Sequence, residues 1–105
     1  MTAESAIELD GGDRAVIRGS LTFNTVPGLY EDMAEHVRNG DLPDSLDLSG
    51  VTAVDSAGLA LLLEWQAVRN QQGASLTITS APSSLVSLAQ LCEAIDLLNL
   101  SGRHE

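Results

Sequence analysis

Segments with the pattern of β-strands alternate with segments of helical periodicity along the chain. Short apolar runs at residues 6–9 and 15–17 flank the turn signal Asp10-Gly11-Gly12-Asp13, which is typical of a β-hairpin. The later strand candidates, residues 45–49 and 75–79, each follow a helical segment, so they pair in parallel through right-handed crossovers. The order β-β-α-β-α-β-α predicts an α/β fold: a mixed, mostly parallel sheet of four to five strands with helices packed on it and an N-terminal β-hairpin.

Start and stop signals delimit three helices. Asn24 or Thr25 supplies a cap for the first helix, and glycines at positions 40 and 73 follow the first two as stop signals. The predicted helices span residues 24–39, 56–72 and 80–92, with a last short strand or turn at 97–100. The 105 residues fit a single domain over 1–105, and we expect 1–5 and 101–105 to be loose.

The most informative segment joins the third strand to the second helix through Asp55-Ser56-Ala57-Gly58. A carboxylate and a hydroxyl stand there at a helix N-terminus, where backbone N–H groups are free and the helix dipole is positive. In one interpretation Asp55 or Ser56 caps the helix and the small residues permit close packing. In the other the turn is an exposed recognition or phosphorylation point. The residues alone favour capping.

The second helix is apolar on two sides. Leu61, Trp65 and Val68 form one stripe, and residues 59, 62 and 63 form another on nearly the opposite side. A helix on one face of a sheet needs only one such stripe. Either both stripes are buried within the domain or one of them contacts a partner, and in so small a domain we favour the partner.

The formal net charge of −10 argues against binding to nucleic acid or to an anionic membrane surface. It suits a protein with a basic partner, although charge that only maintains solubility explains it equally well. Glu31, Asp32 and Glu35 form an acidic helix surface, for which solvation is the favoured interpretation and a basic partner the minority one. The first residues lack a signal-peptide pattern and no apolar run is long enough to cross a bilayer, so we expect a cytosolic protein without direct membrane insertion.

No set of catalytic residues is recognisable, so we expect a protein that is not an enzyme. His36, on a solvated helix surface, and His104, in the tail, have no metal-ligand spacing, and we predict neither a metal nor a cofactor. Cys92 lies in an apolar stretch and is expected to be a buried, unreactive thiol.

The segments around residues 47–49 and 54–59, the leucine-rich helix, Gly73 and the strand at 76–79 together resemble the signature of the STAS family. This fold is shared by bacterial anti-sigma factor antagonists and the cytoplasmic domains of sulfate transporters. In the family's phosphorylation switches the kinase target is the residue directly before the glycine. That position is Ala57, which has no hydroxyl, and Ser56 lies about 100° away around the helix. The resemblance thus makes Ser56 the possible phosphorylation site and disfavours the usual switch.

Among STAS proteins, the run Val54–Leu63 most resembles the small stand-alone subunit of Mla-type phospholipid ABC transporters. The resemblance implies a non-catalytic cytoplasmic subunit, peripheral to the inner membrane, that binds the transporter ATPase and supports outer-membrane lipid asymmetry. The alternative is an anti-sigma factor antagonist that binds a serine kinase. The residues expected to bind the partner are Asp55, Ser56, Ala57, Gly58, Leu59 and Leu62.

Overall fold

The computed structural model describes residues 5–10 and 13–101. Within them the elements are β1 (Ser5–Leu9), β2 (Arg14–Leu21), α1 (Val26–Asn39), β3 (Ser45–Val54), α2 (Ser56–Gln71), β4 (Thr77–Thr79), α3 (Ser83–Leu91), the 3-10 helix η1 (Ile95–Leu97) and β5 (Asn99–Leu100). The predicted loose ends lie mostly outside the described residues, but Ser5 begins β1 and pairs with Gly19. The centre of the predicted hairpin turn, residues 11–12, also lies outside them.

The five strands form one sheet in the order β1-β2-β3-β4-β5. β1 and β2 are antiparallel, and every other neighbouring pair is parallel. The mixed, mostly parallel sheet and its N-terminal hairpin are therefore confirmed. Residues 97–100, expected to be a strand or a turn, divide between η1 and the short edge strand β5.

The central strand β3 is twice as long as predicted. Residues 50–54, interpreted from the sequence as a connection, continue β3 and pair with β2 up to Leu21. Two register shifts in β2, one of them beside Gly19, disturb the alternation that the prediction relied on. Gly50 faces Arg18 at a point where a Cβ atom would lie 3.1 Å from that side chain, so a residue typical of a turn serves close strand packing.

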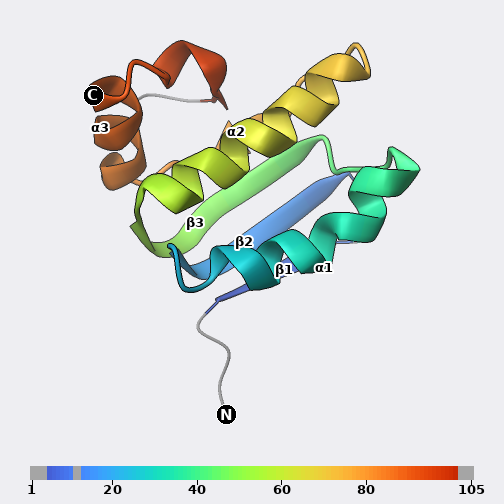
Figure 1. Cartoon of the computed structure of the whole chain (residues 1–105), viewed down its shortest axis with the longest axis horizontal. Coiled ribbons are helices and arrows are strands. Elements are labelled where there is room, and N and C mark those ends of the chain that lie inside the picture. The colour runs from blue at the N-terminus through green and yellow to red at the C-terminus, as the bar shows by residue number, and fades with distance from the viewer. Residues whose placement is uncertain (1–4, 11–12, 102–105) are drawn as a thin grey trace.

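Helices α1 and α2 cover the same face of the sheet, and α3 lies beside α2 (Figure 1). The core between them is built from aliphatic side chains together with Met33 and Trp65. α1 buries Leu29 and Met33, and its predicted stop is confirmed because Gly40 adopts a left-handed backbone with φ 72°.

Cys92 is exposed, so its expected burial was wrong. α3 ends at Leu91, one residue earlier than predicted, and Cys92 forms its C-cap. The chain then turns through a positive φ at Glu93, so the apolar periodicity of Leu85 and Ala89 does not extend to the thiol.

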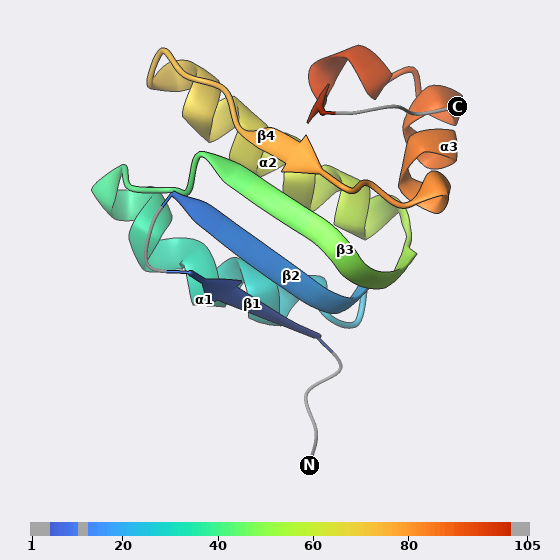
Figure 2. The ribbon, with the colours of Figure 1, turned by 180° about the vertical axis from the view of Figure 1, so that it is seen from behind.

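The opposite face of the sheet is polar. Among the described residues no helix lies over it (Figure 2). Ion pairs join Arg14 to Asp47 and Arg18 to Glu8, each at 2.5 Å, between neighbouring strands.

Candidate functional site

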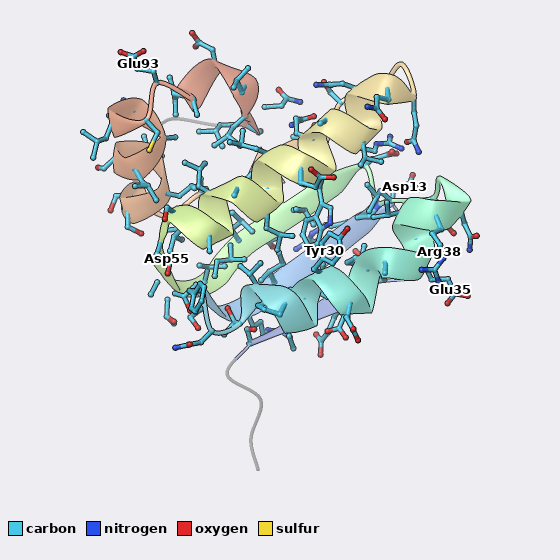
Figure 3. All side chains as sticks on the ribbon, in the orientation of Figure 1. Asp13, Tyr30, Glu35, Arg38, Asp55 and Glu93 are labelled. Carbon is cyan, nitrogen blue, oxygen red and sulfur yellow. The ribbon has the colours of Figure 1, made fainter. Side chains whose placement is uncertain are left out.

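The candidate site lies at the edge of the sheet where β2 and β3 end. Because these strands are parallel, the helices that follow them, α1 and α2, begin at the same edge. Asp55 lies there at the start of α2, beside the loop that leads into α1 (Figure 3). The sheet thus brings the turn at residues 55–58 close to the loop between β2 and α1.

Asp55 is the N-cap of α2. Its backbone is extended, and its Oδ1 accepts hydrogen bonds from the N–H groups of Ala57 at 2.9 Å and Gly58 at 3.2 Å. The capping interpretation is therefore correct for Asp55, whereas Ser56 is the first helical residue. This leaves the Ser56 hydroxyl outside the cap.

The second carboxylate oxygen of Asp55 holds the neighbouring loop. Oδ2 accepts a hydrogen bond of 2.9 Å from the backbone N–H of Phe23. This bond, with those from Gly58 and Ala57, holds the pKa of Asp55 below its ordinary value against the opposing effect of desolvation. Asp55 in its charged form therefore fixes the β2–α1 loop to the start of α2.

Gly58 permits close approach of α2 to the end of β2. A Cβ atom at Gly58 would lie 2.1 Å from the carbonyl oxygen of Leu21, far inside van der Waals contact. That same oxygen accepts the backbone N–H of Asp55 at 3.1 Å. Gly58 is buried and acts through packing, so any role in binding is indirect.

Besides Gly58, two further residues predicted to bind a partner do not reach the surface. Leu59 is 4% exposed and Leu62 is 0% exposed, because α2 lies between α1 and α3 and buries both of its apolar stripes. The sequence analysis favoured a partner contact for one of the two apolar stripes, and for Leu59 and Leu62 that interpretation was wrong. Of the six residues, Ser56 is exposed, Asp55 and Ala57 are partly exposed, and the side chains of Leu59 and Leu62 belong to the core.

Phe23 is a surface residue that the sequence analysis did not single out. Its side chain is 77% exposed, and its N–H is bonded to Asp55. Thr25 occupies the N-cap position of α1, as expected for Asn24 or Thr25, but its hydroxyl makes no capping bond. The hydroxyl instead accepts a bond from the N–H of Thr22 and donates one to the carbonyl of Ser20, which orders the loop from inside. For Phe23 the sequence offered one signal, namely an aromatic residue among polar ones just after the end of a strand.

The described residues contain no group of three histidine, cysteine or acidic side chains arranged to hold a metal ion. His36 is not simply solvated, since its Nδ1 lies 3.1 Å from a carboxylate oxygen of Asp41, and His104 lies outside the described residues. None of the described helices has the length and apolar character needed to cross a membrane.

Residues 6–101 match the family model described as Mlab, STAS domain. The chain is 32% identical over 89 residues to the intermembrane phospholipid transport system binding protein MlaB of Escherichia coli K12. That alignment covers 85% of this chain and 89% of the relative. The protein of the same name from Shigella flexneri matches to the same extent.

Solved structures of anti-sigma factor antagonists share the fold. Unphosphorylated SpoIIAA has a TM-score of 0.68 at 14% identity, covering 94% of this chain and 88% of that one. An antagonist from Mycobacterium paratuberculosis has a TM-score of 0.69 at 20% identity, with coverage of 94% and 85%. At these identities the likeness shows the architecture alone.

Proposed function

Because the chain belongs to the STAS family, with MlaB among its relatives, we propose that it is a non-catalytic subunit of an Mla-type phospholipid ABC transporter. In this proposal it binds the transporter's ATPase, an MlaF-like subunit, and supports its activity. It is cytoplasmic and peripheral to the inner membrane through that partner, and the complex maintains the lipid asymmetry of the outer membrane. The name of the Escherichia coli relative, a binding protein of intermembrane phospholipid transport, supports the assignment.

The observation that carries the proposal is the ordered turn that presents Ser56. Asp55 and Gly58 fix the turn from inside. Ser56 in this turn and Phe23 in the neighbouring β2–α1 loop are both exposed. A regulator of an ATPase needs no active site, only a surface that binds one conformation of its partner better than another. In our proposal this turn docks on the ATPase and stabilises its assembled, active form.

Replacing Ser56 by arginine tests this proposal. We expect Ser56→Arg to lower recovery of the ATPase complex and its ATP turnover about tenfold, because a bulky charge would be forced into a close contact. Ser56→Glu is a second variant, since a carboxylate suits a helix N-terminus and preserves folding. Co-purification from native membranes and an ATPase assay are the measurements.

Gln71→Arg is the matched control, because it places the same exposed charge on the same helix about 22 Å away. It should co-purify like the wild type. The proposal fails if folded Ser56→Arg and Ser56→Glu both recover the complex and turn over ATP normally.

The rival function, an anti-sigma factor antagonist switched by phosphate, is supported by fold alone. The residue before the glycine, Ala57, carries no hydroxyl to phosphorylate. Intact mass measured after incubation with the serine kinases of the same organism separates the two functions. A stoichiometric phosphate on Ser56 would favour the rival.

A further inference from the structure

The outer face of α1 is exposed and carries a large aromatic side chain. Tyr30 is 50% exposed and points from α1 toward α2 (Figure 3). A shallow hollow of about 450 Å³ is lined by Tyr30, Glu31, Asp32, Ala34, Glu35 and Arg38. A half-exposed aromatic ring beside a hollow is a surface suited to receiving a side chain from another protein.

The charges of this face are not balanced within the domain. Arg14, Arg18 and Arg69 pair with carboxylates on β3, on β1 and just before β3, away from the outer face of α1. In the described part of the chain, no ion pair involves the α1 carboxylates. Among the described residues that line the hollow, Arg38, in the last turn of α1, is the one positive charge beside three carboxylates. The outer face of α1 therefore remains acidic, whereas arginines and carboxylates on the uncovered face of the sheet pair with one another.

The outer face of α1, which carries Glu31, Asp32 and Glu35, is continuous with the Ser56 turn. α1 begins at Val26, directly after the loop that carries Phe23, and the Phe23 N–H is bonded to Asp55. Tyr30 lies only about 6 Å further along the helix axis than Val26. A partner that contacts Ser56 and Phe23 thus needs little additional surface to reach Tyr30.

We infer that the docking surface extends from the Ser56 turn onto the outer face of α1, and that a basic segment of the ATPase covers it. This inference rests on the proposed function and specifies the chemistry of the partner. Arginine or lysine side chains of that segment pair with Glu31 and Glu35, and one lies over the ring of Tyr30. The charge of the face selects a basic segment, and the exposed ring distinguishes a contact surface from a merely solvated helix.

Charge reversal on α1 tests the inference. The Glu31→Lys/Glu35→Lys variant and the wild type are compared for binding to the purified ATPase subunit of the same organism's transporter. We expect the association rate constant to fall about tenfold at roughly 0.05 M salt, with the difference largely lost at about 0.5 M, because screened charges no longer steer the encounter. Tyr30→Ala should raise the dissociation rate constant about tenfold.

The matched control is Glu93→Lys/Asp96→Lys, which makes the same change in net charge at the far end of the molecule. It should alter both rate constants less than about twofold. Normal binding by folded Glu31→Lys/Glu35→Lys at both salt concentrations overturns the inference. If Ser56→Arg still weakens binding in that case, the proposed function stands without the inference. If the wild type does not bind the ATPase, both are overturned.

Discussion

At Gly58 the backbone of α2 passes so close to the end of β2 that no side chain fits, since a Cβ atom would meet the Leu21 carbonyl at 2.1 Å. We expect Gly58→Ala to lower the free energy of unfolding by about 3 kcal/mol, because the helix start must move away from the strand. Urea denaturation followed by circular dichroism measures the change.

Gly28 is the control for this prediction. It lies in the first turn of α1, and a Cβ atom there would have nothing within 4 Å. Gly28→Ala should raise the free energy of unfolding by about 0.5 kcal/mol, because it restricts the unfolded chain without strain. Equal denaturation midpoints for the two variants would contradict the packing role of Gly58.

Single residues of the site could be predicted where local chemistry decides their role. Asp55 and Ser56 are both good N-cap residues, so the sequence predicted the cap of α2 to within one residue and the structure assigns it to Asp55. The burial of Leu62 and the exposure of Phe23 depend on how α1 and α3 flank α2, which no local pattern contains. The same limit explains why the burial of Cys92 was predicted wrongly, because helical periodicity does not reveal where a helix stops.

Among the elements, α2 is anchored to the residue just before β4 by one buried polar side chain. Gln66 is 3% exposed; its amide donates to the carbonyl of Leu76 and accepts from its N–H, both at 2.7 Å. We expect Gln66→Leu to destabilise the domain by about 3 kcal/mol, because two buried backbone groups lose their partner. Thermal and urea unfolding report this loss.

Gln71→Leu is the matched variant on the exposed end of α2, and its stability should stay within about 0.5 kcal/mol of the wild type. If Gln66→Leu were equally tolerated, the anchoring role would be disproved. The periodicity of the sequence missed this contact, because a polar residue within a helix is counted as exposed.

The order and type of the elements followed from the sequence, whereas the length of β3 did not. Alternation of hydrophobic residues and glycine stops define α/β topology well, since each signal lies within one element. The second half of β3 is defined by its pairing with β2 across two register shifts. Such pairing is a property of two segments distant in the chain.

At the scale of the whole molecule, the charges of residues 5–10 and 13–101 are distributed unevenly between the two sides of the sheet. The exposed Arg18–Glu8 pair and the half-exposed Arg14–Asp47 pair lie on the sheet side, and exposed pairs contribute only about 0–1 kcal/mol each. The stability of the fold therefore rests on the apolar core between the sheet and α1 and α2. The excess of negative charge opposes folding through repulsion and favours association with a basic partner.

Salt should consequently act in opposite directions on folding and on binding. Raising sodium chloride from about 0.05 M to 0.5 M should increase Tm by roughly 2–6 °C, because screening relieves repulsion within a chain of formal charge −10. The same change should weaken the complex with the ATPase, because it screens the attraction between the outer face of α1 and the basic segment.

In Glu31→Lys/Glu35→Lys each substitution adds two positive charges, which moves the formal charge from −10 to −6, so both salt effects should shrink. Differential scanning calorimetry and titration calorimetry across the salt series measure the two effects. A complex that tightens with salt would show instead that apolar contact alone drives docking, and that the acidity of the helix side serves only solubility.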